Sequence, residues 1–138
     1  MRSYSWLQFI CFVSLAACAG CGAATALNIE KDLEVAALGG DNIKSVIISA
    51  PKKDQKVTVL VRTNQVPVNV YMVPERDLDA VQEKLSNQEA LATPPLAKLE
   101  KSQEGTLEAS VTGGTGFAVV VVNPGSKPAK VALKISGK

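Results

Sequence analysis

Three cysteines, Cys11, Cys18 and Cys21, are the strongest nucleophiles of the chain, and all of them precede residue 22. The C-x-x-C spacing of Cys18 and Cys21 suits a redox pair or one half of a zinc site. The chain has no histidine and no second cysteine pair to complete such a zinc site, and no βαβ pattern surrounds the motif. The spacing therefore does not predict a redox or zinc centre, and no disulfide is expected within the region after residue 21.

Four carboxylates, Glu75, Asp77, Asp79 and Glu83, form the other group that could do chemistry. Calcium is bound by several oxygen ligands of this kind, and glycosidases use a pair of carboxylates. The same residues also suit the exposed face of a helix, with Glu75 and Asp77 near its positive N-terminus. We interpret the group as a solvated helix face and a candidate binding surface, and we predict no metal and no cofactor.

Nucleophilic catalysis lacks its usual base, because the absence of histidine leaves serine and cysteine without the residue that most often activates them. Residues 113–116 (GGTG) resemble a phosphate-binding loop in composition, but such loops lead from a strand into a helix. Here the glycines lead into a β pattern, which predicts a hairpin turn. We therefore predict that the protein is not an enzyme.

Composition excludes two further classes of protein. The 138 residues carry 15 Lys and Arg against 13 Asp and Glu, a formal net charge of +2 that argues against a nucleic-acid partner. Apolar residues make up 46% of the chain, which is too many for a disordered protein, and the length suits one domain. Lysines of the later region could meet anionic lipid or polysaccharide, although we interpret them as residues that protect sheet edges. They are Lys52, Lys53, Lys127, Lys130, Lys134 and Lys138.

The first segment has the pattern of a secretory signal peptide. Arg2 is followed by a mostly apolar run over residues 7–17, and small residues come next. The run is shorter than the roughly 20 residues that a membrane-spanning helix needs. We therefore assign residues 1–17 to a signal peptide.

The end of this segment offers two cleavage sites. Leu15, Ala16, Ala17 and Cys18 resemble the lipobox of bacterial lipoproteins. The resemblance implies that Cys18 is lipidated and becomes the first mature residue, and that Ala19 after it directs the protein to the outer membrane. The alternative is ordinary signal peptidase cleavage after the small-x-small pattern of residues 24–26, with a new N-terminus at Leu27.

The remainder of the chain is dominated by β patterns. Residues 56–63 alternate between apolar and polar positions, as do residues 66–73, and the short turn between them predicts an antiparallel pair. Residues 117–122 (FAVVVV) are apolar at every position, which predicts a central strand covered on both sides. Residues 28–37 fit either a helical turn or a strand. Further strands are expected at residues 43–49, 106–112 and 130–135.

A polar excursion at residues 74–103 interrupts the strands. Leu78, Val81 and Leu85 recur at helical spacing and predict one short amphipathic helix. Long excursions on a compact domain often carry binding functions. We therefore predict an all-β fold, an antiparallel β-sandwich with one short helix in a long inter-strand excursion, over residues 43–138, preceded by a lipid-anchored tether and lead-in at residues 18–42.

The strand sequences VTVLV (57–61), PVNVYMV (67–73), GFAVVVVN (116–123) and VALKI (131–135) resemble small sandwiches of secreted bacterial proteins. These are the pre-peptidase C-terminal domains and the related Golgi-dynamics type domains. The resemblance implies an accessory binding or adhesion role without catalysis. We expect a non-catalytic lipoprotein of the cell envelope with a protein or polysaccharide partner. The alternatives are a soluble periplasmic binding module and, third, a hydrolase.

Overall fold

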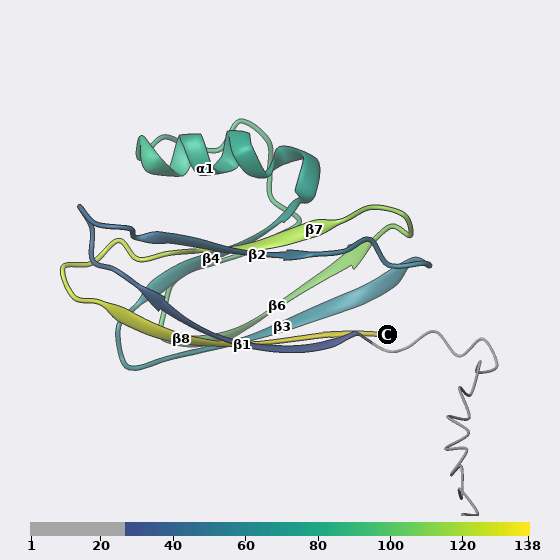
Figure 1. The fold of residues 1–138 in the computed structure, drawn as a ribbon, viewed down its shortest axis with the longest axis horizontal. Coiled ribbons are helices and arrows are strands. Elements are labelled where there is room, and N and C mark those ends of the chain that lie inside the picture. The colour runs from purple at the N-terminus through teal and green to yellow at the C-terminus, as the bar shows by residue number, and fades with distance from the viewer. Residues whose placement is uncertain (1–26) are drawn as a thin grey trace, which may run out of the picture.

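Two four-stranded antiparallel sheets pack face to face in this computed structural model, which describes residues 27–138 (Figure 1). The lower sheet of Figure 1 has the strand order β1-β8-β3-β6, and the upper sheet has the order β2-β7-β4-β5. The all-β sandwich predicted from the sequence is confirmed. The strands are β1 (Asn28–Val35), β2 (Ile43–Ile48), β3 (Gln55–Thr63), β4 (Val68–Pro74), β5 (Ala97–Ser102), β6 (Glu104–Val111), β7 (Phe117–Val122) and β8 (Ala129–Gly137).

Alternation along the strands separates core from surface. In β3, Val57, Val59 and Val61 are buried between the sheets, whereas Leu60 and Arg62 are exposed. Successive side chains of a strand point to opposite faces, so one apolar face is enough to hold β3 on the core. The lower sheet therefore has one buried face and one face in solvent.

Strand β7 differs because all six of its side chains are buried. Phe117, Val119 and Val121 belong to the core between the sheets. Ala118 and Val120 belong to a second apolar cluster on the other side of the upper sheet. The prediction of a central strand covered on both sides is confirmed.

The second cluster is covered by helix α1 (Leu78–Ser86), which follows a short 3-10 turn, η1 (Glu75–Asp77). Figure 1 shows the helix lying across the outside of the upper sheet. Leu78, Val81 and Leu85 pack there against Tyr71 and Val73, as their helical spacing predicts. Two apolar layers therefore hold the upper sheet, one on each side.

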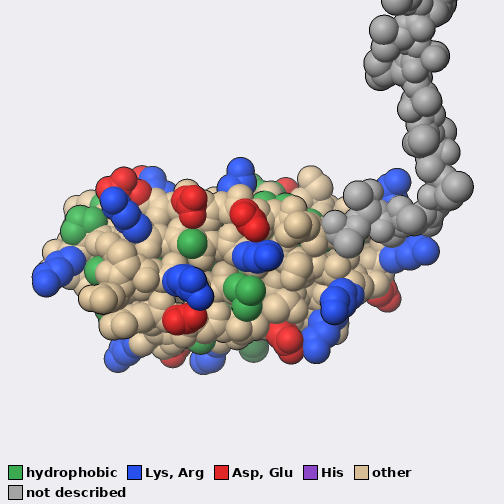
Figure 2. All heavy atoms as spheres, turned by 90° about the horizontal axis from the view of Figure 1, so that it is seen from below, with side chains coloured by type: hydrophobic (Ala, Val, Ile, Leu, Met, Phe, Trp, Pro, Cys, Tyr) green, Lys and Arg blue, Asp and Glu red, His purple; other side chains and the backbone are tan. Residues whose placement is uncertain are grey.

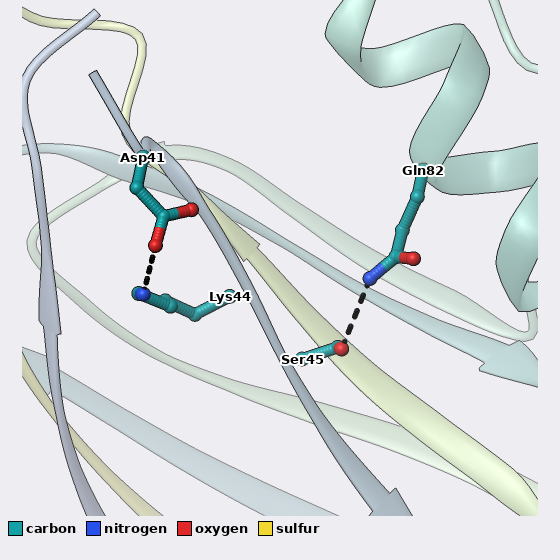
Figure 3. A network of polar contacts seen from close by, with 4 residues as sticks. All are labelled: Asp41, Lys44, Ser45 and Gln82. Atoms are coloured by element: carbon teal, nitrogen blue, oxygen red, sulfur yellow. Dashed lines mark hydrogen bonds and ion pairs between the residues drawn. The ribbon is translucent and has the colours of Figure 1, made fainter.

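One polar contact also joins the helix to the sheet. The Nε2 of Gln82 donates a hydrogen bond to the Oγ of Ser45 in β2 at 3.1 Å (Figure 3). Nearby, Lys44 pairs with Asp41 just before the strand begins. The contact between Gln82 and Ser45 joins the helix to the edge strand β2, whose Ile43 also packs against the apolar cluster.

Two hairpins predicted from the sequence do not form, and both predictions are wrong. Strand β3 pairs with β6 and β8, while β4 pairs with β5 and β7, so the neighbouring strands β3 and β4 lie in different sheets. Strands β6 and β7 are also in different sheets, so residues 113–116 form a corner between the sheets. The physical reason is that each of these strands has an apolar face to bury, and the two faces meet across the core when the chain crosses from sheet to sheet.

The segment left open between helical turn and strand is a strand. Strand β1 pairs with β8 from Asn28 opposite Ser136 to Val35 opposite Ala129. The sandwich therefore begins at residue 28, within the segment that was expected to be tether and lead-in. Ile29 and Leu33 pack against the core and give β1 its apolar face. Residues 97–102 form β5, which lies at the edge of the upper sheet.

A buried asparagine ties the ends of the two sheets together. Asn123 is fully buried, and its Nδ2 donates to the carbonyl of Val35 at 3.3 Å and to that of Lys127 at 2.7 Å. Its Oδ1 accepts from the backbone amide of Gly125 at 3.0 Å. A buried amide of this kind is stable only when its donors and its acceptor are satisfied. Asn123 therefore fixes the turn after β7 against the end of β1.

The two-sided burial of β7 can be tested with isosteric substitutions. Val120→Thr and Val121→Thr each place a hydroxyl in an apolar layer, which we predict lowers the free energy of unfolding by roughly 1–3 kcal/mol. Ser110→Thr, on the exposed side of β6, should change it by less than about 0.5 kcal/mol. Urea unfolding measures all three variants. A tolerated Val120→Thr beside a destabilising Val121→Thr would show that α1 does not seal the outer layer.

Burial of Tyr71 beneath the helix makes stability sensitive to alkaline pH. Desolvation raises the pKa of the phenol above its ordinary value of 10.0, and the negative charge of Glu100 raises it further. The fold therefore favours the neutral phenol. This contribution to stability is fully present below the ordinary value of the unfolded chain and is lost as the pH rises through the higher pKa of the folded state.

We predict that above about pH 10 the free energy of unfolding falls more steeply for the native protein than for Tyr71→Phe. Urea unfolding across alkaline pH measures the difference. The lysines are the same in both proteins, including Lys84, whose pKa is raised by its hydrogen bond to Glu89. Their titration therefore cancels in the comparison. Identical pH dependence of the two proteins would contradict the burial of the Tyr71 phenol.

Candidate functional site

The outer face of the lower sheet is the part of the sandwich without a helix over it (Figure 1). We call it the bare face. Figure 2 views the molecule from this side and shows acidic and basic side chains interspersed, with few hydrophobic ones. Its outward positions are Glu30, Asp32 and Glu34 on β1; Lys130, Ala132 and Lys134 on β8; Lys56, Thr58, Leu60 and Arg62 on β3; and Glu104, Thr106, Glu108 and Ser110 on β6.

Charge on the bare face is ordered by strand. The two edge strands, β1 and β6, present carboxylates, and the two central strands, β8 and β3, present lysines and an arginine. The antiparallel register places opposite charges side by side, because residues opposite each other on neighbouring strands point to the same face of the sheet. The ion pairs are Lys56–Glu108 at 3.1 Å, Arg62–Glu104 at 3.3 Å and Lys134–Glu30 at 3.9 Å.

These ion pairs are exposed, so each contributes little to stability. Their effect is on recognition. A face with positive rows at its centre and a negative row at each edge presents a pattern that a partner must match in register, and mismatched like charges are unfavourable. The bare face can therefore select a partner by charge without contributing much to the fold.

A shallow depression of about 640 Å³ lies in the middle of the bare face. Leu60, 46% exposed, and Ala132 line its apolar part, and Arg62, Lys134 and Glu104 are among the charged residues around it. A second depression of about 530 Å³ shares Arg62 and Ala132 with the first. Together they form a small apolar spot with a polar border, the arrangement found in protein interfaces.

The acidic group identified in the sequence lies on the opposite side of the molecule, in η1 and α1. Glu75, Asp79 and Glu83 are exposed, and Asp77 is half-buried with its Oδ1 3.9 Å from the Nε of Arg76. Within residues 27–138, no group of three His, Cys, Asp or Glu side chains converges as metal ligands do.

One member of that group has a local structural role. The backbone amide of Glu75 donates to the carbonyl of Gly116 at 3.0 Å. The Glu75 carboxylate also lies over Gly116 so closely that a Cβ there would collide with it. A side chain at position 116 would therefore displace the exposed Glu75 carboxylate from the corner that precedes β7.

The glycine corner does not offer its amides to an anion. The amide of Gly113 donates to the Oδ1 of Asp54 at 2.7 Å, and the amide of Gly114 donates to the carbonyl of Pro51 at 2.7 Å. A phosphate-binding loop needs such donors free and directed at the ligand. The corner instead holds the loop between β2 and β3 in place.

The bare face was not predicted as a site from the sequence. Its signal was present as like charges on one face of a strand, at every second residue for Glu30, Asp32 and Glu34 and four residues apart for Lys130 and Lys134. The pattern becomes a surface only when the strands are paired, and the pairing of β1 with β8 joins residues about 100 positions apart. Strand periodicity alone does not specify that partner.

Cys18 and its neighbours Leu15, Ala16 and Ala17 lie outside the described residues, so the lipidation site stays a prediction. Among residues 27–138, neither α1 nor the 3-10 turn has the length and hydropathy to cross a membrane. No protein-family model matches the chain, and a search of curated proteins found no match.

Proposed function

We propose that this chain is a non-catalytic, lipid-anchored module of the cell envelope that binds another protein through its bare face. The observation that carries the proposal is the unequal covering of the two sheets. Helix α1 covers the outside of the upper sheet, whereas the outside of the lower sheet has ordered charges and a central depression around Leu60. A surface that adds little stability yet is patterned in charge is typical of recognition.

The proposed anchor rests on the sequence. Leu15, Ala16, Ala17 and Cys18 follow the apolar run directly, which is the position of a lipobox. Lipidation would place the module on the outer membrane, facing the periplasm or the cell surface. Cleavage after Ala26 would instead give a soluble module with the same bare face.

A protein partner is favoured over a polysaccharide by the side chains available. The aromatic residues among residues 27–138 are Tyr71 and Phe117, and both are buried. No aromatic ring of the described region is therefore free to stack on a sugar. The charges of both signs around Leu60 suit a protein surface, where a small apolar anchor and a polar rim are common.

A non-catalytic role is supported by how the polar residues are used. The buried Asn123 is engaged with three backbone groups, and the carboxylates of the bare face are exposed, with Glu30, Glu104 and Glu108 paired with cations. The sequence has no histidine for acid/base catalysis. The bare face therefore offers contacts and charge, and a turnover assay is the test of the hydrolase alternative.

The anchor is tested by two matched cysteine variants. We predict that Cys18→Ser abolishes lipidation, so that the protein leaves the membrane fraction or accumulates as an uncleaved precursor. Cys21→Ser should be processed and retained like the native protein, because only Cys18 follows the lipobox residues. Membrane fractionation and intact mass measure both. A trimmed Cys18→Ser protein that stays in the membrane would contradict the anchor.

Binding by the bare face is tested by site-specific photocrosslinking in native membranes. We predict that benzoylphenylalanine in place of Leu60 gives one discrete adduct, which disappears when the charges are changed with Arg62→Glu. The same photoreactive residue in place of Asp79, an exposed position of α1, is the control and should give none. A discrete adduct at Asp79 with none at Leu60 would move the binding surface to the helix.

A further inference from the structure

One end of the sandwich gathers lysines from three separate parts of the sequence. Lys52 and Lys53 lie in the loop between β2 and β3, Lys56 lies near the start of β3, and Lys138 follows β8. All four are exposed. We call this group the basic end, and Figure 2 shows basic side chains at the right-hand end of the domain.

Backbone contacts show that these residues share one end of the molecule. The amides of Lys56 and Lys138 each donate to the other residue's carbonyl at 3.0 Å. The amide of Gly137 donates to the carbonyl of Leu27 at 3.0 Å, which brings the first described residue to the same place. A Cβ at Gly113 would lie 2.9 Å from the backbone of Lys53, so that loop packs against this end as well.

Nearby acidic residues offset only part of this charge. Glu108 pairs with Lys56 at 3.1 Å, and the carboxylate of Asp54 accepts a hydrogen bond from the amide of Gly113 at 2.7 Å. Neither Lys52, Lys53 nor Lys138 forms an ion pair among the residues that the structure describes. Three lysines therefore remain available to an anionic partner.

The position of the proposed anchor gives that partner its identity. Cys18 precedes Leu27 by nine residues, and a chain of that length reaches at most about 30 Å. A lipid on Cys18 would hold Leu27, and the basic end beside it, within that distance of the membrane. We propose that the basic end rests on anionic phospholipid headgroups, an inference that depends on the proposed lipidation of Cys18.

This contact would set the orientation of the module. The strands run along the long axis of the sandwich (Figure 1), so an end-on contact stands them upright on the membrane. The bare face then points sideways, where a neighbouring envelope protein can reach it. A lysine near an anionic surface contributes roughly a five-fold preference, so three lysines opposed by the charge of Asp54 bias the orientation by on the order of 20-fold.

The test uses the full, lipid-anchored protein reconstituted in vesicles. Cys21→Ser removes the other thiol near the anchor, so that one introduced cysteine carries the fluorophore. Thr112→Cys places it at the basic end and Ser126→Cys at the opposite end, both at exposed positions. Energy transfer to a lipid-bound acceptor reports the distance to the membrane. In vesicles containing phosphatidylglycerol, transfer should be several-fold greater from position 112 than from 126. In phosphatidylcholine alone, or at high salt, the difference should fall to the smaller one that the tether alone produces, because the headgroup attraction is then absent or screened.

Two variants that each lose three lysines test whether the basic end causes the orientation. Replacing Lys52, Lys53 and Lys138 with alanine should lower the difference in anionic vesicles to the value found in phosphatidylcholine, whereas replacing Lys98, Lys127 and Lys130 should leave it unchanged. Equal transfer from both positions in anionic vesicles, with the protein anchored, would overturn the orientation while leaving the anchor intact. A native protein whose intact mass carries no lipid would overturn the anchor and this inference with it.

Discussion

Burial of β7 on both of its faces is the constraint on which the rest of the structure depends. Its six side chains are all apolar, and none is exposed. One face needs the lower sheet opposite it, and the other needs a cover outside the upper sheet. Leaving either face in water would forgo roughly 1.5–3 kcal/mol for each fully buried valine. The excursion between β4 and β5 supplies the second cover as helix α1.

Because helix α1 covers only the upper sheet, the outer surfaces of the two sheets have different roles. The helix uses the outside of the upper sheet for the apolar contacts of Leu78 and Val81, so that side is part of the core. The lower sheet has no apolar layer outside it, and its strands carry ordered charges instead. Its two edge strands also carry charged side chains, which discourage pairing with other sheets. The bare face is thus available for recognition without loss of core packing.

Elements defined by local periodicity could be predicted from the sequence. The spacing of Leu78, Val81 and Leu85 predicted the helix, and the apolar run of β7 predicted its two-sided cover. Alternation in β3 assigned Val57, Val59 and Val61 to the core. These signals lie within one element, so they need no knowledge of partners.

Strand partners could not be predicted in the same way. The short turn after β3 suggested a hairpin with β4, but both strands have an apolar face, and placing them in opposite sheets buries the two faces against each other. The pairing of β1 with β8, which creates the charge rows of the bare face, joins distant parts of the chain. The candidate site depends on that pairing, whereas the acidic helix group was visible as a local cluster.

Carboxylate labelling in native membranes tests most directly whether the bare face is the binding surface. Glu104 and Glu108 report on that face, and Asp79 and Glu83 report on the helix; all four are exposed. A carbodiimide reaction followed by mass spectrometry compares each position before and after extraction of the protein from its membrane. We predict that labelling of Glu104 and Glu108 increases on extraction while that of Asp79 and Glu83 is unchanged. An increase confined to Asp79 and Glu83 would contradict the account.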